Sequence, residues 1–293
     1  MNFEISVPAT SANLGPGFDS IGVAVSLYLK VRVLEETATW QVEHQMGPEI
    51  PTDEHNLIVK TALELVPELK PHHLQVTSQI PLARGLGSSS SAIVAGIELA
   101  NGLQHLGLSA DEKLQIAVQK EGHPDNVAPA ILGDLVISSY NQIQQTAVSI
   151  KARFPELGLL AFVPPVELLT VESRKALPQT LDFKTAVHAS SIGNTLVAAL
   201  LTNDLDKIGQ LIEQDEFHEK FRAKLVPQLE QLRTLGHQAG AVGTYLSGAG
   251  PTVMTLIQDK QKADFIQLIK KSQFPGKVYD LKVARSGSTI KNF

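Results

Sequence analysis

The sequence predicts an α+β protein of two domains. Segments with the alternating period of strands and segments with the three- and four-residue period of helices are mixed along the chain without regular βα alternation, which favours α+β over a doubly wound sheet. The chain has 293 residues, 43% of them hydrophobic, which is enough for a sizeable core and for two domains. We expect one domain over residues 1–150 and a second over 151–293, because a buried-strand pattern begins at 157.

Two strands open the first predicted domain. Alternating apolar residues over 3–7 and 25–33 enclose the segment PATSANLGPGFDS (8–20), which is rich in turn-forming residues and is expected to present side chains. A helix is expected over 55–66, a strand over 73–80 and a second helix from the serines near 88 to about 106. A third helix is expected from Ser109 to Glu121, since Ser109 and Glu112 have the spacing of a capping box.

The second half has the patterns of both helices and strands, in irregular order. After a glutamine-rich stretch over 141–145, a buried strand is expected at 157–165. Helices are expected at 184–202, 204–216 and 223–238, strands at 241–247 and 252–258, a further helix ending near 272, and a last strand at 277–284. No internal repeat is visible.

Composition excludes several classes of function. The formal net charge is −5 with a pI near 6.0, and no cluster of Lys and Arg indicates a nucleic-acid partner. The absence of cysteine excludes disulfides, thiolate metal sites and thiol nucleophiles. The first residues lack the pattern of a signal peptide and no apolar run reaches about 18 residues, so we expect a cytoplasmic protein with no membrane partner.

The segment PLARGLGSSSSAIVAGIELAN (81–101) places two glycines and four serines ahead of a predicted helix. A flexible linker is the ordinary interpretation of such a composition. However, the amphipathic period that follows favours a helix whose N-terminal amides and dipole hold an anion, with Gly85 and Gly87 letting a phosphate approach the backbone. The segment lacks Gly-Lys-Ser/Thr and a third glycine, so it is neither a Walker loop nor a dinucleotide fingerprint.

The segment EGHPDN (121–126) gathers polar residues at a predicted helix end. It is either a solvated turn or, if the serine loop holds a triphosphate, a source of a carboxylate for Mg²⁺, for which Glu121 is the candidate. A zinc site is disfavoured because no third ligand stands at a recognisable spacing.

Other polar residues allow two interpretations each. SGAGP (247–251) is either a β-turn or a second contribution to one shared site. Arg174 and Arg222 are either solvated or form a clamp for a carboxylate, which guanidinium groups bind in bidentate geometry. Asn13 and Asp19 are either turn residues or site residues.

Three separated motifs resemble one family. PLARGLGSSSSA resembles the phosphate loop of the GHMP kinases, and SGAGPT resembles their C-terminal glycine motif. Within that family, PATSANLGPGFDSIG, EGHPDNVAPAILG and the TxxxRxxLP pattern at 170–178 are most similar to the homoserine kinases. The resemblance implies the two-domain GHMP kinase fold, with an N-terminal domain like domain 2 of ribosomal protein S5 and a ferredoxin-like C-terminal domain.

The resemblance also implies a set of site residues. Asn56 would lie near adenine, and Ser89 and Glu121 would hold Mg²⁺. Asp19 would act in catalysis, by positioning or as a base. The phosphate loop would comprise Pro81, Leu82, Ala83, Arg84, Gly85, Leu86, Gly87, Ser88, Ser89, Ser90 and Ser91. The substrate pocket would comprise Asn13, Asp19, His123, Asp125, Thr170, Arg174 and Arg222.

The activity that this resemblance implies is transfer of a phosphoryl group from ATP, with Mg²⁺, to L-homoserine in threonine biosynthesis by a homodimer. The alternatives are a GHMP kinase for another small alcohol, such as mevalonate or a sugar, and a non-catalytic member that senses a ligand. Fold membership alone does not decide among them.

Overall fold

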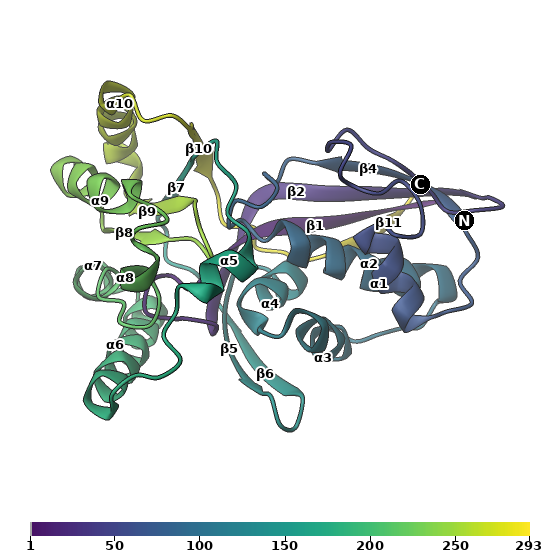
Figure 1. Ribbon diagram of the computed structural model, residues 1–293, viewed down its shortest axis with the longest axis horizontal. Helices are drawn as coiled ribbons and strands as arrows, with labels where there is room; N and C mark the ends of the chain where they lie inside the picture. The colour runs from purple at the N-terminus through teal and green to yellow at the C-terminus, as the bar shows by residue number, and fades with distance from the viewer. Residues whose placement is uncertain (1) are drawn as a thin grey trace.

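The computed structural model describes residues 2–293 and contains two β-sheets, which lie side by side along the long axis of the molecule (Figure 1). In the first sheet the strand order is β11-β1-β2-β4-β3, and β5 pairs with β2 and with β6. Its strands are β1 (Phe3–Ala12), β2 (Ile21–Glu36), β3 (Gln41–Glu43), β4 (His72–Ser78), β5 (Leu135–Asn141), β6 (Thr146–Ala152) and β11 (Thr289–Asn292). The long β2 is shared, because β4 pairs with its second half and β5 with its first three residues.

Four helices accompany the first sheet. They are α1 (Leu57–Leu65), α2 (Ser88–Gln104), α3 (Ala110–Glu121) and α4 (Pro124–Leu132). Helices α2, α3 and α4 contact the strands of this sheet, and α1 packs on α2. The capping box predicted at the start of α3 is confirmed: Ser109 Oγ accepts from the Glu112 amide at 3.2 Å, and Glu112 Oε2 accepts from the Ser109 amide at 2.8 Å.

The second sheet has the order β10-β7-β9-β8 and is antiparallel throughout. Its strands are β7 (Gly158–Val163), β8 (Gly243–Leu246), β9 (Val253–Ile257) and β10 (Lys277–Leu281). The helices of this half are α5 (Thr170–Lys175), α6 (Phe183–Thr202), α7 (Leu205–Leu211), α8 (Glu219–Arg222), α9 (Gln228–Ala239) and α10 (Lys262–Ser272), with a short 3₁₀ turn at Asp259–Gln261.

Helix α4 was not expected, because the sequence analysis treated EGHPDN as a turn after α3. Pro124 occupies the first helical position, where a proline fits, and Pro129 lies inside the helix. Pro129 has no amide to donate to the carbonyl of Asp125. That carbonyl lies against Gly22 of β2, where a Cβ atom would come within 1.8 Å of it, so the helix packs closely on the strand.

Other elements differ from the expected pattern in length. Strand β1 continues to Ala12, so residues 8–12 of the segment expected as a loop are strand, and α7 and α9 are shorter than the predicted helices. Strands β3, β5, β6 and β11 and helices α5 and α8 were also not predicted. The division of the chain at residue 150 stays a prediction; β11, from the end of the chain, pairs with β1 in the first sheet.

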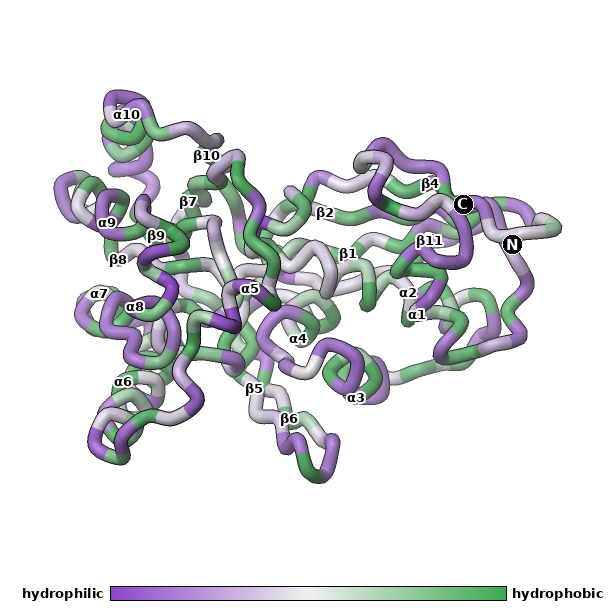
Figure 2. Tube along the Cα trace, in the orientation of Figure 1, coloured by the Kyte–Doolittle hydropathy of each residue, from purple (hydrophilic) through white to green (hydrophobic). Residues whose placement is uncertain are grey.

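One hydrophobic core connects the two sheets. It runs from residues of the first sheet such as Ile5 and Val31 through Leu159 to Leu196 and Ile212. A smaller core fills the space between the second sheet and α9 and α10. Hydrophilic residues lie on the outer turns of α7, α8 and α10, while β1 and β7 are largely hydrophobic (Figure 2).

A buried chain of hydroxyl groups also joins the two halves. Ser247 Oγ donates to the carbonyl of Gly85 at 2.6 Å. Because that uses its only proton, Ser11 Oγ donates to Ser247 at 2.8 Å, and the Tyr245 hydroxyl donates to Ser11 at 2.9 Å. Burial raises the pKa of Tyr245 well above its ordinary value, so this hydroxyl stays a donor. The series of hydrogen bonds therefore runs from Tyr245 to the carbonyl of Gly85 in the predicted phosphate loop.

Candidate active site

The predicted phosphate loop leads directly into α2, a helix of 17 residues. Gly87 is its N-cap in the left-handed conformation, with φ of 69°, and supplies no side-chain cap. The first amides of the helix therefore keep their donors for another partner, at the positive end of the helix dipole. This arrangement suits an anion.

Gly85 and Gly87 are required both because neighbouring atoms leave no room for a side chain and because each has a left-handed backbone conformation. Gly85 has φ of 74°, and a Cβ atom there would lie 2.4 Å from the carbonyl oxygen of Ser247. At Gly87 a Cβ atom would lie 2.1 Å from Thr10 Oγ1. The glycines predicted to bring the backbone close to a ligand also bring it close to β1 and to the 247–251 turn.

A polar cleft of about 820 Å³ lies in front of the loop, between the two halves of the chain. It brings together most of the residues predicted from the sequence. Those that line it are Asn13, Asp19, Ala83, Arg84, Gly85, Gly87, Ser88, Ser89, Ser90, Glu121, His123, Asp125, Thr170, Arg174 and Arg222. Leu86 and Ser91 are instead buried, and Ser91 Oγ donates to the carbonyl of Pro8 at 3.1 Å.

A second, more apolar cavity of about 930 Å³ lies on the other side of the loop. Ala83, Ser88 and Ser89 line both cavities. The second cavity contains Leu82 and Asn56, whereas Pro81 lines neither. Asn56 is buried, and its side chain caps α1 by accepting from the Ile58 amide at 3.1 Å. Its contact with adenine stays a prediction.

Glu121, at the end of α3, reaches the start of α2. Its Oε1 accepts from Ser90 Oγ at 2.7 Å, and both residues line the polar cleft. Ser90 is buried and Ser89 is exposed, so the hydroxyl that orients Glu121 is Ser90, whereas the sequence analysis pairs Glu121 with Ser89. A carboxylate and hydroxyl groups beside a helix N-terminus form a donor set that suits Mg²⁺ with a phosphate.

The acidic side of the cleft holds Asp19, His123 and Asp125, whose ligand atoms lie within 4.8 Å of one another. His123 Nδ1 lies 2.5 Å from Asp125 Oδ1. Burial lowers the pKa of His123, but the negative charges of Asp125, Asp19 and Glu121 outweigh burial and raise the pKa above its ordinary value. The imidazolium is thus favoured between the carboxylates.

The guanidinium of Arg222 is buried, with 2% of the residue exposed. It donates to the carbonyl of Gly248 at 3.1 Å and to His218 Nδ1 at 3.0 Å. Both partners are uncharged, and no carboxylate of residues 2–293 pairs with the Arg222 guanidinium. Burial, and repulsion by Arg174, lower the pKa of Arg222 to about 10, so the group stays charged at neutral pH.

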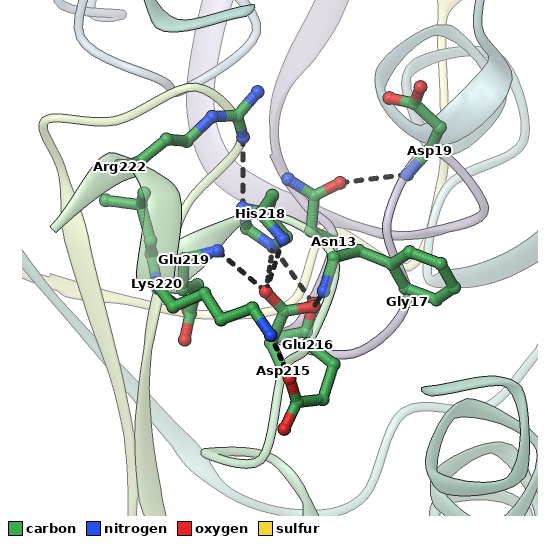
Figure 3. A network of polar contacts seen from close by, with 12 residues as sticks. Asn13, Gly17, Asp19, Asp215, Glu216, His218, Glu219, Lys220 and Arg222 are labelled. Atoms are coloured by element: carbon green, nitrogen blue, oxygen red, sulfur yellow. Dashed lines mark hydrogen bonds and ion pairs between the residues drawn. The ribbon is translucent and has the colours of Figure 1, made fainter. Parts of the chain in front are cut away.

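His218 forms a hydrogen bond with the Arg222 guanidinium (Figure 3). Since a guanidinium only donates, His218 Nδ1 accepts, and Nε2 carries the proton that it donates to the carbonyl of Gly15 at 3.1 Å. The pKa of His218 is lowered to about 4, chiefly by burial; Asp215 opposes this effect and the positive charge of Arg222 adds to it. The neutral ring therefore leaves the charge of Arg222 uncompensated.

Comparison with known proteins identifies the family of this chain. Residues 56–134 match the family model of the GHMP kinases N-terminal domain, and residues 196–275 match that of the GHMP kinases C-terminal domain. A homoserine kinase of Lactococcus lactis subsp. cremoris is 55% identical over 98% of both chains. The chain belongs to the GHMP kinase family.

Two further relatives cover nearly the whole of this GHMP kinase. A homoserine kinase of Limosilactobacillus fermentum is 56% identical over 98% of this chain and 99% of the relative. The solved structure of a Listeria monocytogenes protein, provisionally named a homoserine kinase, is 44% identical and superposes with a TM-score of 0.89 over 99% of this chain and all of the other. The predicted family and two-domain fold are confirmed.

Some residues of the cleft were missed by the sequence analysis of this GHMP kinase. Phe18 contacts both arginines, with its ring centroid 5.6 Å from the guanidinium carbon of Arg174 and 5.4 Å from that of Arg222. Asn126 lines the cleft and accepts from Thr10 Oγ1 at 2.7 Å. Asn126 belongs to the EGHPDN segment but was not assigned to the site, and Phe18 gave no signal beyond its place in the first loop.

No helix formed by residues 2–293 of this GHMP kinase has both the length and the apolar character needed to cross a bilayer.

The neutral state of His218 predicts a pH-dependent contribution to stability. Its folded pKa of about 4 lies below the ordinary value of 6.5, so between these values the unfolded chain binds more protons. The contribution is present above about pH 6.5 and is lost as the pH falls toward about 4, by up to about 3 kcal/mol.

This prediction is tested by comparing wild type with His218→Asn, which cannot gain this proton. The difference in free energy of unfolding, measured by urea denaturation, should shrink as the pH falls from about 7 to about 4.5. Titrations shared by both proteins cancel in the difference. A constant difference over this range would contradict the assignment of a neutral His218.

Proposed function

We propose that this GHMP kinase transfers the γ-phosphoryl group of ATP to the side-chain hydroxyl of L-homoserine, forming O-phospho-L-homoserine. The observation that carries the proposal is Arg222, a buried guanidinium that has no carboxylate partner among residues 2–293 and lines a cleft beside a helix N-terminus suited to an anion. Burying an unpaired charge is costly. A substrate carboxylate removes that cost and fixes the end of the substrate distant from the phosphates.

The whole cleft fits a small amino acid that carries a hydroxyl. Two arginines, Arg174 and Arg222, suit its carboxylate, while Asp19 and Asp125 suit its ammonium group. A sugar would leave the arginines unused, and mevalonate, which has no ammonium group, would leave the carboxylates unused. The relatives that are named homoserine kinases support the same substrate.

The chain's own residues then perform three tasks. The amides at the start of α2 and the helix dipole bind the phosphates, with the base on the side of the apolar cavity. The acidic residues and arginines align the acceptor, and Asp19 acts by positioning. Phosphoryl transfer through a loose transition state requires mainly this alignment and the neutralisation of charge, so a strong base is not needed.

Mg²⁺ would be held by Glu121 and Ser89, with Ser90 orienting the carboxylate through its hydroxyl. When bound, the ion neutralises negative charge on the phosphate oxygens. That the enzyme works as a homodimer in the cytoplasm stays a prediction.

The proposal is tested by ADP release in a coupled assay with ATP, Mg²⁺ and one candidate acceptor at a time. We expect release with L-homoserine and not with mevalonate or galactose. Release with one of the other acceptors would assign a different substrate. Absence of release with all of them, in protein that binds ATP, would indicate a non-catalytic member that senses a ligand.

Substitution of Arg222 should weaken acceptor binding selectively. Loss of one charge-assisted contact costs about 1.5 to 3 kcal/mol, so Arg222→Ala should raise the KM for L-homoserine about tenfold to about a hundredfold. The KM for ATP should change little. Arg153→Ala is the control, because that arginine lies on the surface with 74% of its side chain exposed. An unchanged KM for homoserine in folded Arg222→Ala would contradict the carboxylate assignment.

Substitution of Glu121 should change the requirement for metal. Glu121→Gln should raise the Mg²⁺ concentration for half-maximal activity by about tenfold or more, because a carboxylate ligand is lost. Ser89→Ala should have an effect of the same kind, and the exposed Glu68→Gln should have none. If the Mg²⁺ dependence of Glu121→Gln equals that of wild type, the metal is held elsewhere.

A further inference from the structure

Asp19 and Arg174 form an ion pair across the proposed substrate cleft. Arg174 Nη2 lies 2.6 Å from Asp19 Oδ1, and Nη1 lies 3.0 Å from Oδ2, so the pair is bidentate. About one third of each side chain is exposed, 33% for Asp19 and 35% for Arg174. Both residues line the cleft. A ligand that enters the cleft therefore finds Asp19 and Arg174 already bonded to each other.

The two partners are held with unequal firmness. The amide of Asp19 donates to Asn13 Oδ1 at 3.1 Å, and Asn13 Nδ2 donates to the carbonyl of Gly248 at 3.0 Å. Asp19 also has a φ of 55°, a conformation that this network fixes. Figure 3 shows Asp19 tied to Asn13 in this way.

Arg174 belongs to α5, a short helix with few buried contacts. Helix α5 has six residues, of which only Ser173 is buried, and Ser173 Oγ donates to the carbonyl of Ala249 at 2.7 Å. The Arg174 side chain is therefore the partner that can leave the pair without disturbing the backbone of the cleft.

A second guanidinium contacts the same aromatic ring. The centroid of the Phe18 ring lies 5.6 Å from the guanidinium carbon of Arg174 and 5.4 Å from that of Arg222, and both arginines line the cleft. Arg222 is fixed and is bonded to uncharged acceptors. A carboxylate bound at Arg222 would thus draw Arg174 toward it and away from Asp19.

We propose that Asp19 and Arg174 are an exchangeable ion pair that selects an acceptor carrying both charges. The ammonium group of the acceptor replaces Arg174 at Asp19, and the released Arg174 joins Arg222 at the acceptor carboxylate. This inference rests on the proposed function, in that the acceptor is an amino acid.

The selection follows from what each ligand leaves unpaired. A ligand with both charges replaces one ion pair by two. A ligand with only a carboxylate takes Arg174 and leaves Asp19 without a partner, and a ligand with only an ammonium group does the reverse. An unpaired, partly buried charge is a cost that discriminates against such ligands.

The test therefore asks whether removing one partner improves the binding of a singly charged ligand. The probe is 4-hydroxybutyrate, which has the hydroxyl and the carboxylate of homoserine but no ammonium group. Its affinity is measured by calorimetry for wild type, Asp19→Asn and Asp125→Asn, so that no turnover is needed. Asp125→Asn is the matched control, because it removes the same charge from the same cleft at a residue bonded to His123 and not to Arg174.

Asp19→Asn should bind 4-hydroxybutyrate about tenfold more tightly than wild type, because Arg174 is already free, and should bind homoserine more weakly. Asp125→Asn should show no comparable gain. The reciprocal probe, 3-amino-1-propanol, should bind Arg174→Gln about tenfold more tightly than wild type. Arg222→Gln, which removes a nearby charge not bonded to Asp19, should show no such gain.

Equal affinities in wild type and Asp19→Asn, or an equal gain in the two aspartate variants, would overturn the exchange. These outcomes are separate from a failure of the proposed function. If wild type releases no ADP with L-homoserine, the substrate is wrong, whereas ADP release without the gain in Asp19→Asn leaves the substrate intact and removes only the exchange.

Discussion

The close approach of two glycine turns, one from each half of the chain, is the constraint on which the site depends. The turn at Gly85 lies so near the turn at 247–251 that no side chain fits between them. The amides of Leu168 and Thr252 donate to the carbonyls of Ala83 and Arg84, and Ser247 Oγ donates to that of Gly85. The loop's carbonyl groups are thereby engaged by the second half, and the amides of α2 remain for the cleft.

The same contact positions the arginines. Arg84 donates to the carbonyls of Pro164 and Pro165, just before the segment that leads into α5. The phosphate loop and the helix that carries Arg174 are therefore parts of one hydrogen-bonded unit. Arg222 completes the site from α8, and its own hydrogen-bond partners are uncharged, whereas Arg174 is paired with Asp19.

The sequence predicted those parts of the site that depend on local pattern. Small residues ahead of an amphipathic period predicted the helix N-terminus, and the spacing of Ser109 and Glu112 predicted a capping box. Helix α4 was missed because Pro129 is ordinarily a signal against a helix, and the close packing of α4 on Gly22 of β2 depends on a residue distant in the sequence. Short strands such as β3 depend on a neighbouring strand and carry little pattern of their own.

Contacts between distant residues were beyond local pattern. The orientation of Glu121 by Ser90 depends on how α2 meets α3, and 31 residues separate the two. The pairing of Asp19 with Arg174 spans 155 residues and requires both halves of the fold. The roles of Phe18 and His218 likewise arise from the stacking of their rings, with centroids 5.1 Å apart, which no sequence motif records.

The last strand, β11, has a consequence for how the molecule is made. It pairs with β1, the first strand, so the two ends of the chain lie close together (Figure 1). During translation β1 emerges well before β11, which follows every strand of the second sheet, and the β1 edge of the large sheet stays open until β11 has been made. The N-terminal half therefore cannot reach its final form as an independent unit on the ribosome, and a circularly permuted chain with joined ends would remove this delay.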